Sequence, residues 1–355
     1  MKIADTQEFS IAFPRMSGRM DCFDELKGIA IVFIVLFHAG GVLFWNNYFH
    51  GDLGTDMFFL ISGICLSLNS EQMHPTEFLV RRVVRILPTY LIILTGFVLL
   101  NATVLGLHYS PGVLIAHYLC VHAFFGDAWA FSISEPMWFI TAILCYYVGF
   151  LALRSKLKKL DVFFLITGMM SCGGVLLLFF LGQGGLMGRW GLRMPDFFMG
   201  MVIGHALHSG KLTIPVTPLL GIALFFLLYL PYTRGIFFHT GVVALGVVVI
   251  FAVTLRPWLR KSELGSVALR SLAFLGKHSL EIFLIHQPLM REYNMFVQQH
   301  WLGVPQPDSF ELIEGIVFSV AVTILVSVEL HSLTRRFAKL TIEHVSILWQ
   351  RRPLA

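Results

Sequence analysis

The sequence predicts an all-α integral membrane protein of about ten transmembrane helices, and three observations carry that prediction. Apolar residues (Ala, Val, Ile, Leu, Met, Phe, Trp, Tyr and Cys) make up 56% of the 355 residues, and only 13% are charged. The mean hydropathy is +0.76. A soluble domain carries about twice this charged fraction, because its core needs a solvated shell. Ten stretches also approach the roughly 20 apolar residues that a helix needs to cross a bilayer.

The ten predicted spans follow one another along the whole chain. They cover residues 27–45, 53–69, 88–107, 136–153, 161–181, 194–209, 216–231, 237–255, 274–290 and 311–334. Residues 111–131 are apolar too, but His117, His122 and Asp127 interrupt them. We expect this segment to form a lateral or re-entrant helix that does not cross the membrane.

The distribution of lysine and arginine predicts the orientation. With a cytoplasmic N-terminus, 22 of the 26 basic residues lie inside, and only Arg189, Arg193, Arg234 and Arg291 lie outside. Cytoplasmic loops of membrane proteins carry such an excess. We therefore expect both termini in the cytoplasm, with residues 1–26 as an N-terminal tail and 335–355 as a basic C-terminal tail.

The whole chain, residues 1–355, is predicted to be a single membrane domain. No internal repeat is visible, and no polar segment is long enough for an appended soluble domain. The net charge of +5 comes from short clusters between apolar runs, so nucleic-acid binding is not expected. The five cysteines have no ligand-like spacing, and we expect neither a metal site nor a disulfide.

The first predicted span carries three ionisable residues, Asp24, Lys27 and His38. Lys27 and His38 are eleven residues apart, about three turns, so they share a helix face with a rise of about 16 Å. Lys27 then lies at the cytoplasmic interface, where Asp24 can pair with it, and His38 lies near the midplane. An imidazole there can take up and return a proton. The alternative is a histidine bonded to a neighbouring helix.

The entrance to the third span carries two arginines three residues apart, Arg82 and Arg85. Guanidinium groups on one helical face suit forked recognition of phosphate. The alternative is an ordinary positive-inside anchor, which the same two residues would also provide.

The second and fourth spans open with weaker candidates. Asp56 lies at the extracytoplasmic boundary, where it would orient His38, contact an acceptor hydroxyl, or only favour the positive end of a helix dipole. Trp138 is either a functional residue or a member of the interfacial aromatic belt. Gly54 and Gly63 permit close helix approach.

The ninth span contains an acid and a histidine, Glu281 and His286. An ionisable residue at membrane depth needs a partner, so Glu281 predicts one without naming it. Helix packing and a histidine at the membrane interface explain the same pair equally well.

In order, these blocks resemble the acyltransferase-3 family of polytopic membrane proteins. The family's opening motif, an acid and a basic residue followed by ten residues and a histidine, matches Asp24, Lys27 and His38. Three further blocks match as well, namely Gly54 to Gly63, the Arg-x-x-Arg that precedes Pro88 and Tyr90, and Phe283 to His286. Each motif alone is weak, but the ordered set is specific and covers nearly the whole chain.

Two departures bear on the subgroup and the acceptor. Lys27 stands where the family usually has arginine, which keeps the charge but loses the fork. Many members also have an acid five residues after the tryptophan of span four, where this chain has Ile143.

The resemblance implies a membrane-embedded O-acyltransferase of a bacterial inner membrane, with no bound cofactor. Such an enzyme moves an acyl group, commonly acetyl, from coenzyme A to a hydroxyl of an envelope polysaccharide or lipid-linked sugar. In this scheme Lys27, Arg82 and Arg85 bind the donor on the cytoplasmic side. His38 serves as base or acyl carrier, and Asp56 supports it from the outer side.

A proton-coupled transporter of a small solute or lipid-linked sugar is the competing hypothesis, because it would also use a midplane histidine and a few acids. The absence of inverted halves and of paired broken helices in the sequence favours the enzyme. A non-catalytic scaffold would have no use for His38 or for the arginine pair.

Overall fold

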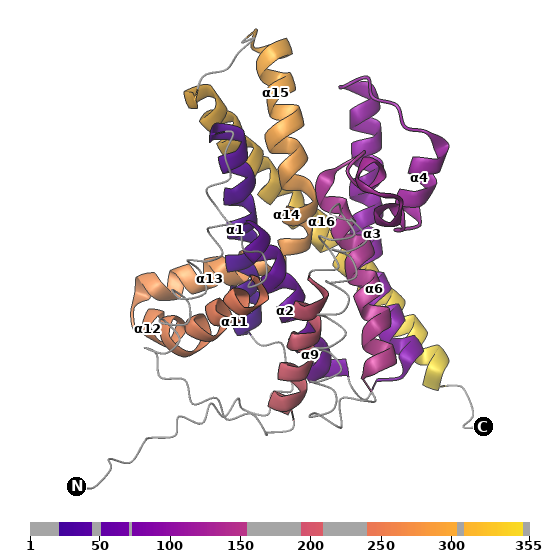
Figure 1. Cartoon of the computed structure of the whole chain (residues 1–355), viewed down its shortest axis with the longest axis vertical. Coiled ribbons are helices and arrows are strands. Elements are labelled where there is room, and N and C mark those ends of the chain that lie inside the picture. Colours follow the sequence, from indigo (N-terminus) through magenta and orange to yellow (C-terminus); the bar gives the residue numbers. More distant parts are fainter. Residues whose placement is uncertain are drawn as a thin grey trace, which may run out of the picture.

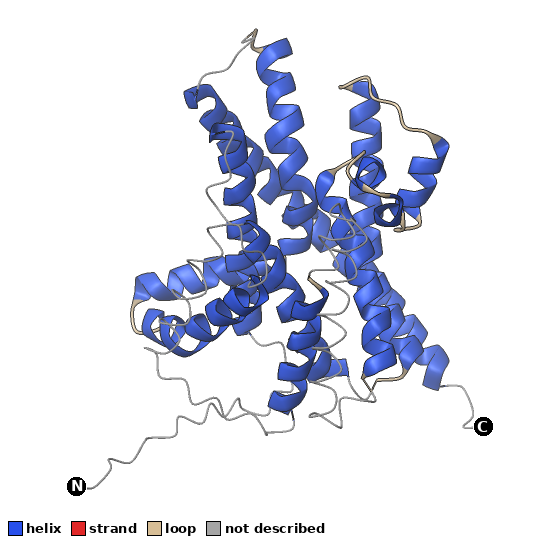
Figure 2. Cartoon of the chain, viewed as in Figure 1, coloured by secondary structure: helices blue, strands red, loops and turns tan. Residues whose placement is uncertain are grey.

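The structure, a computed structural model, describes residues 21–44, 51–70, 73–154, 193–208, 240–303 and 309–350. Every regular element in these ranges is a helix (Figure 2), which confirms the predicted fold class. Two of the ten predicted spans, 161–181 and 216–231, lie outside the described residues. Figure 1 labels the helices and shows them packed as one bundle of crossing rods.

The first three long helices follow the predicted spans closely. They are α1 (Asp21–Phe44), α2 (Gly51–Ser70) and α3 (Pro75–Thr103). Asp21 and Asp24 occupy the first turn of α1, where carboxylates favour the positive helix end. The helix therefore begins six residues before the expected span, and residues 21–26 belong to it and not to a tail.

Helix α3 also begins earlier than predicted. Pro75 occupies its first turn, where a missing N–H costs nothing, and the helix continues past Pro88 to Thr103. Arg82 and Arg85 thus lie within a continuous helix.

Residues 111–131 do not cross the membrane as one helix. They form α4 (Pro111–Tyr118), the short 3-10 helix η1 (His122–Phe125) and α5 (Asp127–Ala130). Gly126 separates η1 from α5. Eight residues of helix span about 12 Å, far less than the roughly 30 Å of hydrocarbon. Burial lowers the pKa of both His117 and His122, in the latter case to about 3, and their rings stack 4.0 Å apart.

The middle of the chain adds η2 (Glu135–Met137), α6 (Trp138–Leu153), α9 (Met194–His208), α11 (Thr240–Ile250), the π-turn η4 (Phe251–Leu255) and α12 (Arg256–Leu259). Helices α2 and α9 touch backbone to backbone. A Cβ atom on Gly63 would collide with the carbonyl oxygen of Phe197, and one on Gly54 would meet that of Ala30 in α1. Both predicted glycines therefore lie at close helix contacts.

The predicted ninth span, 274–290, is wrong as a single helix. Helix α13 (Glu263–Lys277) ends and α14 (Ser279–Pro288) begins at His278, whose backbone leaves the helical region. Beyond α14 the chain stays helical through η5 (Leu289–Tyr293), α15 (Asn294–Phe296) and η6 (Val297–Trp301), where a loop was expected. Pro288 removes one backbone donor, and the wider π-turn of η5 follows it directly.

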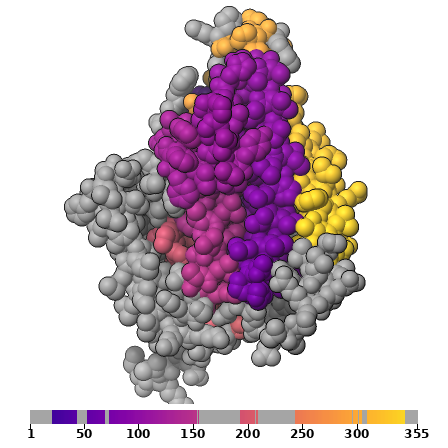
Figure 3. Space-filling model, turned by 90° about the vertical axis from the view of Figure 1, so that its right-hand side faces the viewer, coloured from indigo at the N-terminus to yellow at the C-terminus, as the bar shows by residue number. Residues whose placement is uncertain are grey.

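Residues 335–350, which the sequence predicts to belong to a basic C-terminal tail, are helical as well. Helix α16 runs from Ser309 to Gln350, 42 residues or about 63 Å, and crosses the molecule obliquely (Figure 1). It packs against α3, where the Thr89 hydroxyl donates to that of Thr334 at 3.1 Å, and Figure 3 shows the two helices side by side. Its end extends well beyond a hydrocarbon core of about 30 Å.

Four helices in the described part of the chain are long and apolar enough to cross a membrane. They are Asp21–Leu43, Pro75–Thr103, Glu135–Ala152 and Ser309–Glu343. Two shorter apolar helices, Leu53–Leu68 and Val243–Leu259, coincide with further predicted spans. The chain is therefore a membrane protein, while the total of ten spans and the cytoplasmic position of both termini stay predictions.

Candidate active site

The structure brings together two histidines that lie about 250 residues apart in the sequence. His38 in α1 and His286 in α14 have ring centroids 5.1 Å apart. His286 is fully buried, whereas His38 is half-buried. The motif of the first span and the late histidine motif thus belong to one site.

The hydrogen bonding of His286 fixes which of its nitrogens carries the proton. Its Nδ1 lies 2.9 Å from the carbonyl oxygen of Ile282, which can only accept, so Nδ1 is the protonated nitrogen. Its Nε2 then carries a lone pair. Within the described residues this buried atom has no hydrogen-bond partner. A buried lone pair next to a second imidazole suits proton transfer or the acceptance of a substrate hydrogen bond.

Three polar residues lie beside the histidine pair, and none of them is a site residue that the sequence predicts. Gln287 follows His286 directly, and its Nε2 donates to Glu135 Oε2 at 3.0 Å. The Arg291 guanidinium lies 4.0 Å from the same oxygen and within electrostatic reach of His38. We call His38, His286, Gln287, Glu135 and Arg291 the outer cluster. The sequence does offer a signal for Glu135, because it is an acid directly before the fourth predicted span.

An aromatic wall lies next to the outer cluster. Phe58 of α2, Phe139 of α6 and Phe283 of α14 pack with ring centroids 5.0 to 6.4 Å apart. Phe283 also lies 6.2 Å from His286. These rings keep water from one side of the imidazoles, which strengthens electrostatic interactions there.

Asp56 forms an ion pair with an arginine that sequence analysis had counted only as an outer loop charge. Its carboxylate lies 3.1 Å from the Arg193 guanidinium, and the two side chains are 1% and 9% exposed. Asp196 lies within electrostatic reach of both Asp56 and Arg193, and Trp138 lies under Arg193 at 5.5 Å. The ring neighbours of His38 are Phe37 and His286. A role of Asp56 and Trp138 in catalysis therefore stays a prediction.

The predicted donor residues lie near a half-buried cysteine in α2, Cys65. Lys27 pairs with Asp24 at 3.7 Å, as their spacing predicts. Lys27, Asp24, Arg82 and Arg85 all lie within electrostatic reach of the Cys65 thiol. We call Asp24, Lys27, Arg82 and Arg85 the inner cluster. It joins α1 and α3, two helices that the sequence alone does not place next to each other.

The two arginines of the inner cluster differ in environment. The Arg82 guanidinium lies over the rings of Phe78 and Tyr147, at 5.4 and 5.9 Å from their centroids. Arg85, one turn later, is exposed. The predicted pair of guanidiniums is therefore one that stacks on two rings and one that is exposed.

Glu281 has the partner that its burial demanded. His331 of α16 donates from Nδ1 to Glu281 Oε1 at 3.0 Å, an interaction that ties α14 to α16. Glu25, at the start of α1, forms a two-pronged ion pair with Arg256 of α12. Within the described ranges, no group of three His, Cys, Asp or Glu side chains is arranged to hold a metal ion.

Comparison with known proteins places the chain in a family. The family model described as an acyltransferase domain, acyltransferase-3, matches residues 20–331. A protein of Komagataeibacter xylinus, BcsY, carries the name of a membrane-bound transacylase and is 38% identical over 82 residues. That match covers 22% of this chain and 19% of the relative's length. No solved structure matches. The chain belongs to the acyltransferase-3 family of membrane acyltransferases.

Proposed function

We propose that the chain is an O-acetyltransferase of a bacterial inner membrane. It takes acetyl from acetyl-CoA on the cytoplasmic side and transfers it to a hydroxyl of an envelope polysaccharide or lipid-linked sugar. The observation that carries this proposal is the contact between His38 and His286 within the outer cluster, where their ring centroids are 5.1 Å apart.

His38 is the proposed catalytic base. It is half-buried and accessible, whereas His286 behind it is fully buried. As the acceptor oxygen attacks the thioester carbonyl carbon, His38 takes the hydroxyl proton. The C–S bond then breaks, and the proton passes to the departing thiolate. The products are an acetyl ester and free coenzyme A, so the atoms balance without a cofactor.

His286 is proposed to position His38 and stabilise its protonated form. With Nδ1 bonded to Ile282, its Nε2 lone pair is available to an N–H of its neighbour. The alternative route passes through an acetyl-histidine: the His38 ring nitrogen attacks the thioester carbonyl, and the C–S bond breaks to release the thiolate. The acceptor oxygen then takes the acetyl group from the ring nitrogen, and its proton passes to the thiolate.

The outer cluster is proposed to bind the acceptor sugar. The Glu135 carboxylate lies 3.0 Å from the Gln287 amide and 4.0 Å from the Arg291 guanidinium. Such groups hydrogen-bond to sugar hydroxyls and can hold one of them near His38. Asp56, held by Arg193, is proposed to support this side through the adjoining ion pair.

The inner cluster is proposed to contact the donor. Lys27, Arg82 and Arg85 supply three cations at the end of α1 and α3 that the positive-inside rule assigns to the cytoplasm. Coenzyme A is cytoplasmic and carries several phosphate charges. Its acyl arm would extend along α1 from Lys27 toward His38, a rise of about 16 Å.

A complementation assay tests the proposal. A strain that lacks the protein receives the wild type, His38→Ala, or the control His300→Ala, which changes an exposed histidine outside the cluster. We expect the wild type and the control to restore acetyl esters on the surface glycan and His38→Ala to fail, at equal protein levels in the membrane. Restoration by His38→Ala would remove His38 as the base, and glycans identical in all strains would favour the transporter.

A further inference from the structure

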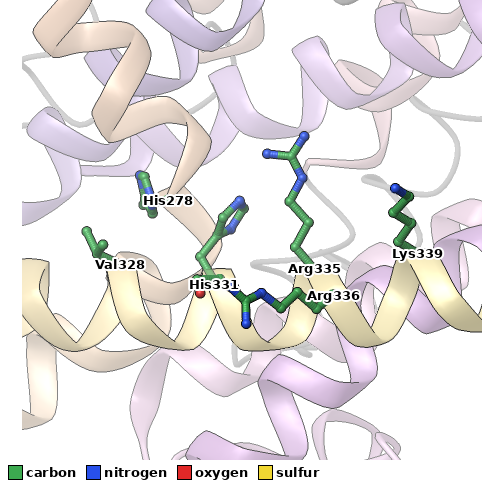
Figure 4. A pocket seen from close by; sticks show the side chains of 7 residues that line it. His278, Val328, His331, Arg335, Arg336 and Lys339 are labelled. Carbon is green, nitrogen blue, oxygen red and sulfur yellow. The ribbon is translucent and has the colours of Figure 1, made fainter.

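Basic side chains line a cavity beside residues 328–339 of α16. Its volume is about 430 Å³, and its basic lining residues are His278, His331, Arg335, Arg336 and Lys339. His331, Arg335 and Lys339 are four residues apart and share one face of α16, and Arg336 lies beside that face. His278 closes the cavity from the junction of α13 and α14 (Figure 4).

The basic side chains line the cavity in two orientations. Figure 4 shows Arg335 and Lys339 extending from α16 on the side of the His331 ring, while Arg336 lies along the helix next to it. The rings of His278 and His331 are 4.8 Å apart. The cavity therefore presents two imidazoles, two guanidiniums and one ammonium group.

Carboxylates neutralise this charge only in part. Glu281 accepts from His331 at 3.0 Å, and Glu343 lies 3.8 Å from Lys339 in an exposed pair. In the part of the chain that the structure describes, neither Arg335 nor Arg336 has a carboxylate within ion-pair distance. Together with the neighbouring lysine, these two arginines suit a phosphate monoester, because its oxygens accept several charge-assisted hydrogen bonds.

The position of the cavity relates it to the proposed active site. Glu281, which holds His331, lies five residues before His286 on α14, a rise of about 8 Å. The bond between Thr89 and Thr334 holds α16 against α3 one turn from Arg85. Among the lining residues, Lys339 lies farthest along α16 from His331, the residue that Glu281 holds. A ligand with a reactive group at one end and a phosphate at the other could bridge the two places.

We propose that this cavity binds the 3′-phosphate end of coenzyme A. The inference rests on the proposed function and deepens it, because it assigns the donor's adenosine end to α16 and leaves the diphosphate and acyl arm to the inner cluster. The thiol and the 3′-phosphate lie at opposite ends of coenzyme A, as His286 and Lys339 lie at opposite ends of this arrangement. A volume of 430 Å³ is within the usual range for a ligand pocket.

Isothermal titration of the purified full-length protein in neutral detergent tests the assignment. Coenzyme A and 3′-dephospho-coenzyme A are titrated into the wild type, Arg335→Gln/Arg336→Gln, and the control Lys261→Gln/Arg270→Gln, which removes two exposed charges outside the cavity. We expect the first pair to raise the Kd for coenzyme A on the order of tenfold or more. Its Kd for 3′-dephospho-coenzyme A should stay within about twofold of wild type. The control should bind both ligands as wild type does.

The alternatives give different results. Equal coenzyme A binding by the wild type and Arg335→Gln/Arg336→Gln would overturn the cavity assignment while leaving the donor intact. No binding of coenzyme A by the wild type would overturn the proposed function itself. If anionic-lipid nanodiscs raised the Tm of the wild type but not of the double variant, with unchanged coenzyme A binding, the cavity would hold a lipid headgroup. Arg335→Lys/Arg336→Lys, which keeps the charge, guards against misfolding and should lose less affinity than the glutamine pair.

Discussion

The outer and inner clusters are both polar sites within an apolar bundle, yet they are built from different chemistry. The outer cluster combines two imidazoles with an acid, an amide and an arginine, and one imidazole nitrogen is buried with a lone pair to spare. The inner cluster has three cations and a single acid. The first can move protons and hold hydroxyls, and the second can hold phosphates. Under the proposed function, donor recognition and chemistry would be separated along α1.

Removing the His38 imidazole from the outer cluster should have the largest effect on activity. His38→Ala is expected to lower kcat about 10² to 10⁴-fold, the usual contribution of general acid-base catalysis, with little change in KM for acetyl-CoA. Radiolabelled acetyl transfer by purified protein measures both constants. A large rise in KM with unchanged kcat would assign His38 to donor binding and erase the difference between the clusters.

Breaking the ion pair of Asp56 and Arg193 tests whether Asp56 acts in the reaction or only in the fold. Asp56→Ala leaves the Arg193 guanidinium buried without its carboxylate, which costs about 3–5 kcal/mol. The apparent Tm in detergent should fall well below that of Glu314→Ala, an exposed control. The double variant Asp56→Ala/Arg193→Met should regain much of that loss. If it regains stability but no activity, Asp56 acts in the reaction as well as in the fold.

The unequal arginines of the inner cluster predict unequal tolerance. Arg82→Lys removes the planar group that stacks on Phe78 and Tyr147, and it should raise the Kd for acetyl-CoA about five- to tenfold. Arg85→Lys keeps an exposed charge and should change the Kd less than about twofold. Titration calorimetry compares them directly. Equal losses would mean that stacking on the rings does not orient Arg82, and unchanged affinity in Arg82→Ala and Arg85→Ala would remove both from the donor site.

The smallest expected effect concerns the lateral segment next to the bundle. Burial lowers the pKa of His122 to about 3 in the folded protein, whereas an unfolded histidine titrates near 6.5. Its contribution to stability is therefore complete above pH 6.5 and is lost as the pH falls toward 3. At pH 5.5 the loss is about 1.4 kcal/mol. The Tm should fall between pH 7 and 5 more in the wild type than in His122→Asn, and parallel curves would contradict the neutral buried histidine.

The all-helical fold and the pair of Asp24 with Lys27 could be predicted because both depend on local pattern. Apolar runs reveal helices of the right length, and the spacing of Asp24 and Lys27 predicts their pair. The pairing of His38 with His286, and of Glu281 with His331, depends on which helices become neighbours. A single sequence carries no information of that kind.

The misplaced helix boundaries have physical causes too. Hydropathy follows apolar length, so it joined α13 and α14 across His278 and ended α16 where its basic face begins. A helix can continue beyond the apolar segment that spans the membrane, as α16 does to Gln350. Glu135 and Arg193 were missed for a related reason, since a charge at the edge of an apolar run resembles a loop charge until a buried partner is found for it.

The measurement that tests the account most directly is acetyl transfer in sealed membrane vesicles of known orientation. Radiolabelled acetyl-CoA, which does not cross membranes, is added outside inverted or right-side-out vesicles that contain the wild type or His38→Ala. We predict alkali-labile label in glycan or lipid-linked sugar only in inverted vesicles, whose cytoplasmic face is outward, and only with the wild type. Equal labelling in right-side-out vesicles, or undiminished labelling with His38→Ala, would contradict an inner donor site joined to an outer histidine site.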